Sequence, residues 1–138
     1  MSLRLLRGTL TGAVVYFFLG WLVWGVLLMG FMEANSNTSL NRPMEEMLWW
    51  AIILANLVTG FLTTLILNWA GAKSTLDGLR IGAIVGALFA LSMDLSYYSM
   101  TSLISNVSVI LVDGLANGVV AAVTGALIVL LWGKARSD

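Results

Sequence analysis

Residues 76–98 read LDGLRIGAIVGALFALSMDLSYY. Every fourth position of this stretch belongs to one series, first small and then polar: Gly78, Gly82, Gly86, Ala90, Asp94 and Tyr98. Residues four apart lie on one face of a helix, so the series forms a small-residue ridge. In a membrane helix such a ridge lets a neighbouring backbone come close, and an acid on it faces protein rather than lipid. The stretch therefore predicts a membrane helix that packs tightly against a neighbour.

The overall composition indicates the class of protein. The chain has 138 residues, of which 59% are hydrophobic and 10% are charged, and its mean hydropathy is +0.95. Soluble domains use only about 45–50% apolar residues. We therefore expect an integral membrane protein in contact with the lipid bilayer, organised as a single membrane domain over residues 1–138.

The residue types that are missing limit the chemistry. The chain contains neither Cys nor His, which excludes disulfides, thiolate chemistry, His-ligated haem and most zinc sites, but not carboxylate-bound metals. The formal net charge is zero, so no basic excess points to nucleic acid. We expect no cofactor, no metal and no enzymatic activity.

Four apolar runs are long enough to cross a bilayer, which takes about 20 residues. They lie at about residues 9–32, 47–70, 77–100 and 107–132. A polar stretch at residues 33–46 forms an outer loop between the first two, and the other connections are short. Short connections join antiparallel neighbours, so the sequence predicts an all-α, antiparallel bundle of four transmembrane helices.

The basic residues predict the orientation. All but one of them fall on one side of the predicted spans: Arg4, Arg7, Lys73, Arg80, Lys134 and Arg136. Only Arg42 falls on the other side. By the positive-inside rule both termini are cytoplasmic, and we expect a multi-pass protein of the plasma membrane, with the bacterial inner membrane as its location.

The fourth span carries a ridge that complements the third. It reads polar first and small last, in the series Asp113, Asn117, Ala121 and Gly125. Two such ridges match end for end when their helices are antiparallel. We expect the third and fourth helices to be the closest pair, with Gly86 and Ala90 packed against Ala121 and Gly125.

Similar stripes follow the first two spans. The first is Gly8, Gly12, Tyr16, Gly20 and Trp24, and the second is Asn56, Gly60, Thr64 and Asn68. Aromatic rings prefer the membrane interface, so we interpret the six tryptophans as interfacial and packing residues.

Asp94 and Asp113 are the two acids placed inside predicted spans, roughly 8–12 Å from the outer helix ends. A carboxylate inside a membrane costs about 2.5–3.5 kcal/mol and is a functional hypothesis by default. One interpretation is an ion- or proton-binding site made by Asp94, Asp113, Asn117 and Asn56, in which two close carboxyls retain one proton between them. The other is that each acid joins helices through hydrogen bonds to Asn117, Asn56, Ser92 or Tyr97.

Three segments carry a resemblance to a known family. They are the aromatic-rich LGWLVWG at residues 19–25, the small turn AGAKSTLDGLRIG that enters the Gly-rich third helix at residues 70–82, and LVDG at residues 111–114, which places a polar residue near the start of the fourth apolar run. In these segments the chain resembles the bacterial membrane proteins grouped as domain of unknown function 1761. The resemblance implies a four-span fold and a membrane location, and it brings no known activity.

Two classes of function follow from these patterns. The first is a non-enzymatic accessory or stabilising subunit of a larger membrane complex, with other membrane protein chains or a second copy as partner. The second is a small oligomeric proton- or cation-coupled transporter or channel that uses Asp94 and Asp113. An enzyme fits least, because two carboxylates without His, Cys or a catalytic motif offer little chemistry.

Overall fold

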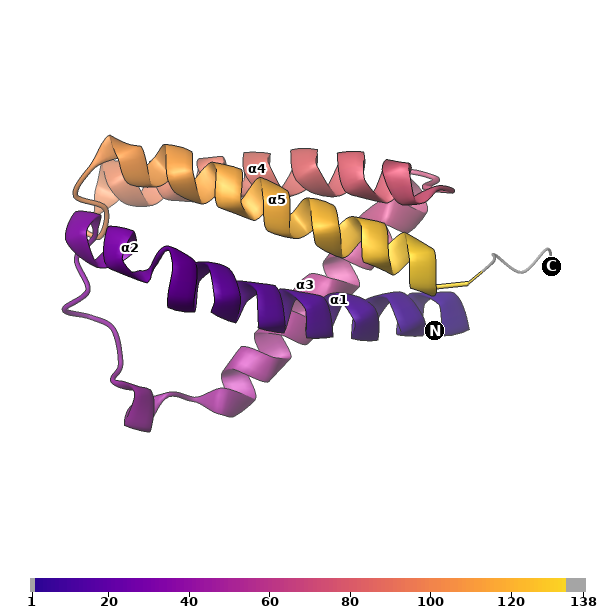
Figure 1. Cartoon of the computed structure of the whole chain (residues 1–138), viewed down its shortest axis with the longest axis horizontal. Coiled ribbons are helices and arrows are strands. Elements are labelled where there is room, and N and C mark those ends of the chain that lie inside the picture. Colours follow the sequence, from indigo (N-terminus) through magenta and orange to yellow (C-terminus); the bar gives the residue numbers. More distant parts are fainter. Residues whose placement is uncertain (1, 134–138) are drawn as a thin grey trace.

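Helices make up nearly all of the computed structural model, which describes residues 2–133. In chain order they are α1 (Leu3–Leu22), the π-helical turn η1 (Val23–Leu27), α2 (Met29–Asn35), the 3-10 turn η2 (Met44–Glu46), α3 (Trp49–Trp69), α4 (Thr75–Met100) and α5 (Val107–Leu131) (Figure 1). The four spans that run over Leu3–Leu27, Trp49–Trp69, Thr75–Met100 and Val107–Leu131 are long and apolar enough to cross a membrane. The predicted all-α bundle of four membrane helices is therefore confirmed.

The first span differs from the predicted helix at residues 9–32. It begins earlier, at Leu3, because the Ser2 hydroxyl caps the helix by accepting a hydrogen bond from the Leu5 amide at 3.2 Å. It is also interrupted, since η1 ends α1 and α2 then continues to Asn35. The basic residues Lys134 and Arg136 lie outside the described residues.

The turn into α4 follows its sequence pattern closely. The Ser74 hydroxyl accepts from the Asp77 amide at 3.1 Å, and Asp77 Oδ2 accepts from the Ser74 amide at 3.0 Å, which completes a capping box. Gly71 has a φ of 71°, a left-handed conformation that glycine adopts without strain. This turn reverses the chain direction between α3 and α4. Asp77 acts as part of the N-terminal cap of α4.

The pair of α4 and α5 forms the most extensive contact in the fold (Figure 1). Their backbones touch at the glycines of α4, with Gly78 against Gly125 and Gly82 against Ala121. A Cβ added at Gly86 would lie 2.7 Å from the Asn117 carbonyl oxygen. The prediction that these two helices form the closest pair is confirmed.

The register between α4 and α5 differs from the prediction. Gly86 does pack on Ala121, but Gly125 lies against Gly78 and Gly82 instead of Gly86 and Ala90. The physical reason is the methyl group of Ala90, which is buried but holds a neighbouring backbone farther away than glycine does. Closest approach therefore centres on the glycine end of the ridge.

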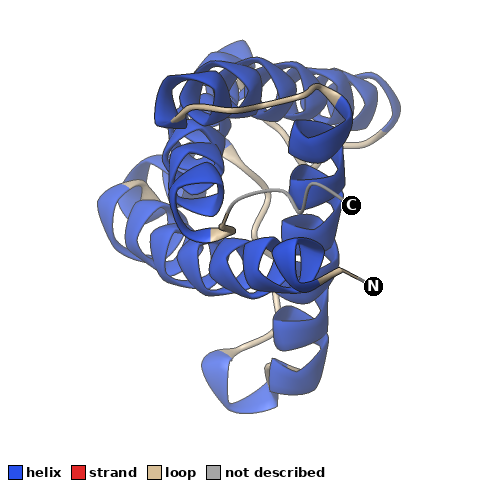
Figure 2. Cartoon of the chain, turned by 90° about the vertical axis from the view of Figure 1, so that its right-hand side faces the viewer, coloured by secondary structure: helices blue, strands red, loops and turns tan. Residues whose placement is uncertain are grey.

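A second tight contact joins α1 to α3. A Cβ at Gly12 would lie 2.8 Å from the Gly60 Cα, and a Cβ at Gly60 would lie 2.6 Å from the Ala13 amide nitrogen. α1 also packs on α5, whereas α3 has few contacts with α4 and α5. The start of α3 and the loop before it consequently lie apart from the other helices (Figures 1 and 2).

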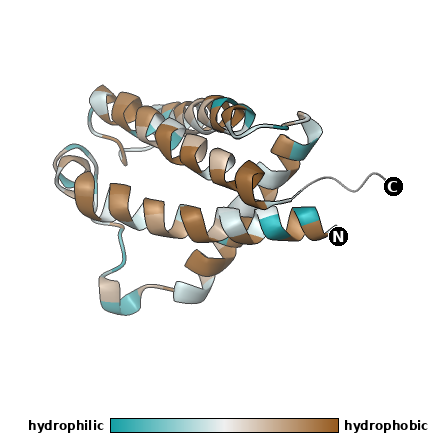
Figure 3. Ribbon diagram, turned by 45° about the vertical axis from the view of Figure 1, so that its right-hand side comes forward, coloured by the Kyte–Doolittle hydropathy of each residue, from teal (hydrophilic) through white to brown (hydrophobic). Residues whose placement is uncertain are grey.

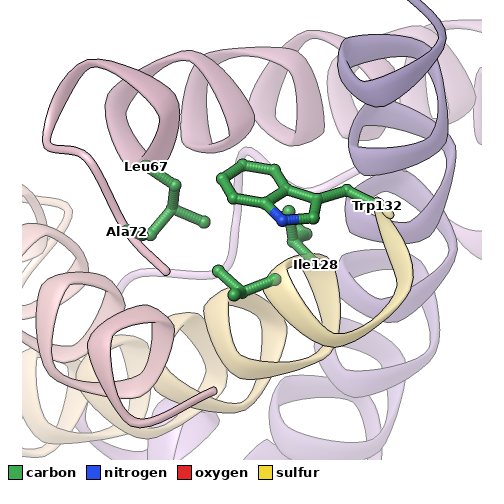
Figure 4. Close-up of a cluster of buried hydrophobic side chains, with 5 residues drawn as sticks. Leu67, Ala72, Ile128 and Trp132 are labelled. Carbon is green, nitrogen blue, oxygen red and sulfur yellow. The ribbon is translucent and has the colours of Figure 1, made fainter. Parts of the chain in front are cut away.

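The core lies at the end of the bundle where α5 finishes. Leu67, Ala72, Ile128, Val129 and Trp132 form one buried cluster there (Figure 4). Half of the spanning part of α5 is buried (50%), against 6% for the first span. Hydrophobic residues make up most of the long helices (Figure 3), and many of their large apolar side chains are exposed, as expected for a protein that contacts a lipid bilayer.

Candidate functional site

A hydrogen-bonded polar cluster surrounds Asp113 in the spanning part of α5. Asp113 Oδ1 accepts from the Trp24 indole Nε1 at 2.8 Å, and Oδ2 accepts from Asn117 Nδ2 at 3.1 Å. Asn117 Nδ2 also lies 2.9 Å from the Asp113 carbonyl oxygen, on its own helix. Both oxygens of the carboxylate therefore have donors, and one of those donors ties the first span to α5.

The π-helical turn that contains Trp24 is a local departure from the α-helix. The Leu28 amide donates to the Val23 carbonyl at 2.7 Å, a bond that closes a turn one residue wider than an α-helical turn. Such turns are rare, and those that do occur are frequently found at functional sites. Here the turn carries the indole that reaches Asp113.

Beyond this turn, α2 covers the end of the helix pair. The Asn37 amide donates to the Leu103 carbonyl at 2.7 Å, and the Ser105 amide donates to the Asn35 carbonyl at 3.0 Å. The α4–α5 connection is thus hydrogen-bonded to the end of α2 and to the residues that follow it.

Asp94 on α4 faces this cluster. Its carboxyl lies beside that of Asp113, so the structure brings together the two acids that share a predicted depth. Asp94 Oδ2 is buried and has no hydrogen-bond partner among residues 2–133. A proton on one of the two carboxyls would add a donor to this pair, because a protonated carboxyl is a donor.

Asn56, predicted to join the acids, lies elsewhere. Its Nδ2 donates to the Ile52 carbonyl at 2.8 Å, and its side chain lines a groove between α1 and α3. The physical reason is that this part of α3 packs on α1, whereas α3 meets α5 near its other end, at Leu67. Within the described residues, the side chains of Ser92 and Tyr97 also make no hydrogen bond to Asp94 or Asp113.

Trp24 is the member of the site that sequence reasoning missed, because it was interpreted as an interfacial or packing tryptophan. A usable signal was present. Trp24 ends the first-span stripe that begins with Gly8 and Gly12, and these glycines face α3 and α5. An indole on that stripe is directed toward protein, where its N–H needs an acceptor.

The described part of the chain offers few groups that could hold a metal. It contains no set of three or more acids that could ligate one ion. The fold and the cluster together define a multi-pass membrane protein with a part-buried carboxyl pair between two of its helices. No family model, no curated protein and no solved structure matches the chain, so the resemblance to domain of unknown function 1761 stays a prediction.

Replacement of Trp24 by Phe tests whether the Asp113 cluster joins the helices. Trp24→Phe keeps an aromatic ring but removes the only donor to Asp113 Oδ1 in the described residues, and should lower the free energy of unfolding by about 1–2 kcal/mol. Trp21→Phe, at a side chain that is 63% exposed, is the matched control and should change stability little. Unfolding of both variants in one detergent would give the comparison, and equal stabilities would show that the bond does not hold the helices together.

Proposed function

We propose that this chain is a non-enzymatic membrane protein that acts as an accessory or stabilising subunit of a larger membrane complex. The observation that carries the proposal is an apolar groove with one polar group in its wall, between α1 and α3. The groove has a volume of about 320 Å³. Its apolar lining comes from both helices: Leu10, Val14, Phe17, Phe18, Ile53 and Leu57.

The groove exists because the two helices touch at one place and then separate. Gly12 and Gly60 bring the backbones into contact, and toward its start α3 runs away from α1 (Figure 1). A V-shaped opening of this kind has the shape to receive another helix along its length. In a membrane, lipid chains or a partner helix must fill it.

Asn56 favours a partner helix over lipid. Its amide makes one hydrogen bond, to a carbonyl of its own helix, so its side-chain oxygen has no partner among the described residues. Lipid chains cannot donate hydrogen bonds, whereas Ser, Thr, Asn or Gln of another helix can. An asparagine that lines a groove at membrane depth is therefore best satisfied by a second protein chain.

The polar cluster supports the same proposal. One Asp113 oxygen joins the first span to α5 through Trp24, and the other accepts from Asn117 on the same helix, which is what a structural acid does. The chain also lacks the Cys and His side chains that perform most catalysis at neutral pH.

We place both termini in the cytoplasm and the protein in the bacterial inner membrane. The support is the sequence asymmetry of the Lys and Arg residues. Membership of the domain of unknown function 1761 group is part of this proposal and adds no activity to it.

Photo-cross-linking in intact cells tests the groove as a docking site. With benzoylphenylalanine at Val14, a groove residue, irradiation should yield a defined adduct whose cross-linked peptide is a transmembrane segment of another protein. The matched position is Leu115, 73% exposed on α5, which should give lipid adducts alone. Asn56→Leu should reduce the Val14 adduct several-fold, because the polar contact is lost.

Two results would contradict the accessory role. One is the same set of adducts from Val14 and Leu115, which would mean that lipid fills the groove. The other is a Val14 adduct that contains only peptides of this chain, which would identify a homo-oligomer.

A second candidate function, an oligomeric proton- or cation-coupled transporter or channel, is favoured by one specific observation. Asp94 Oδ2 is buried beside a second carboxyl and has no donor among residues 2–133. Carboxyl pairs of this kind bind and release protons in many membrane pathways. An ionisable group at this depth lowers the stability of the protein, which is why such groups mark functional sites.

Flux into liposomes separates the two candidates. If the pair conducts protons, Asp94→Asn should abolish flux and keep the fold, because the amide keeps the shape and loses the exchangeable proton. Asp77→Asn, the same chemical change at the helix cap, should leave flux unchanged. An absence of flux from the parent, with equal or higher thermal stability of Asp94→Asn, would end the transport candidate, since removal of a costly buried acid is then neutral or stabilising.

A further inference from the structure

We infer that the end of the bundle where α1 begins and α5 finishes binds the anionic phosphate headgroup of a membrane lipid. A cavity of about 390 Å³ opens there. It is lined by the first helix, the α3–α4 turn and the last residues of the chain that the structure describes: Arg4, Ala72, Lys73, Val129, Leu130 and Trp132.

Arg4 is the central group of this cavity. Its guanidinium carbon lies 3.8 Å from the centre of the Trp132 ring, a cation–π contact. Trp132 is only 3% exposed and is packed beside Leu67, Ala72 and Ile128 (Figure 4), so it forms a rigid platform. The ring thereby holds the guanidinium in a fixed plane at the cavity wall.

The hydrogen-bonding capacity of Arg4 is mostly unused. A guanidinium carries five N–H donors, and those of Arg4 find one acceptor in residues 2–133, the Ala72 carbonyl oxygen at 3.4 Å. Its Nε is buried without any partner in the same residues. The unpaired N–H groups lie in the guanidinium plane, in an arrangement that matches two oxygens of a phosphate. A buried N–H without an acceptor lowers stability, so binding of an acceptor there is favourable.

Two further cations lie around Arg4. Lys73 lines the same cavity, and Arg7 Nη1 lies at its rim, 3.1 Å from the point where a Cβ on Gly133 would project. The acid nearest to Lys73 in sequence is Asp77, whose Oδ2 already accepts from the amides of Lys73 and Ser74. The cavity is therefore positively charged, and the neighbouring Asp77 carboxylate is already hydrogen-bonded in the cap of α4.

The position of the cavity favours a lipid over a soluble anion. It lies at the ends of membrane-spanning helices, where a bilayer has its headgroups. Val129, Leu130 and the Trp132 ring form its apolar side, along which an acyl chain can run while the phosphate meets Arg4. Basic pockets between helices at such interfaces bind anionic headgroups.

Lipid titration of the purified protein in dodecyl maltoside tests this site. Dioleoyl phosphatidylglycerol should bind, as counted by native mass spectrometry, and should raise the thermal unfolding midpoint, whereas dioleoyl phosphatidylcholine should do neither. Arg4→Gln should weaken phosphatidylglycerol binding about fivefold or more. Lys73→Gln, at an exposed side chain, should weaken it in the same direction and provides the test if Arg4→Gln does not fold.

Arg42→Gln is the matched control, because it removes one positive charge from an exposed loop and should bind as the parent does. Equal phosphatidylglycerol affinity in Arg42→Gln, Lys73→Gln and a folded Arg4→Gln would overturn the proposal. Equal binding of the two lipids would also overturn it. A midpoint rise with millimolar inorganic phosphate as large as that with phosphatidylglycerol would assign the site to a soluble anion instead.

Discussion

The backbone contact between α4 and α5 is the constraint on which the rest of the structure depends. Lipid removes the hydrophobic drive that joins helices in water, so two membrane helices associate through close packing and polar contacts. Gly78, Gly82 and Gly125 allow that packing, because each lies against the backbone of the facing helix. The same contact buries α5 more than any other span and sets the register that brings Asp94 to Asp113.

The polar and apolar features of the molecule follow from this arrangement. With α5 at the centre, Asp113 becomes an attachment point that the Trp24 indole can reach from the first span. Over much of its length α3 packs mainly against α1. Because the two helices diverge, a groove that Asn56 lines opens between them. The accessory and transport functions differ in which feature they use, the groove in the first case and the carboxyl pair in the second.

Much of the fold could be predicted from the spacing of small residues. Repeats of four identified the α4–α5 pair and the meeting of its two acids, because that spacing is the geometry of a helix face. The register was wrong because glycine and alanine were treated as equally small, whereas one methyl group decides where backbones touch. The π-helical turn has no local signal in residues 23–27. Asn56 is misplaced in the prediction because the divergence of α3 depends on tertiary contacts.

The register of α4 on α5 can be measured directly, since the chain contains no cysteine. The Ala87 Cβ lies 3.2 Å from the position of a Cβ on Gly118, near the separation of about 3.5–4.5 Å that a disulfide needs. Oxidation in membranes should bridge the Ala87→Cys/Gly118→Cys variant, and should not bridge Ala87→Cys/Val119→Cys, whose second site is 63% exposed. A bridge in Ala87→Cys/Ala122→Cys with none at Gly118 would contradict the account, because it would shift α5 by one turn and separate Asp94 from Asp113.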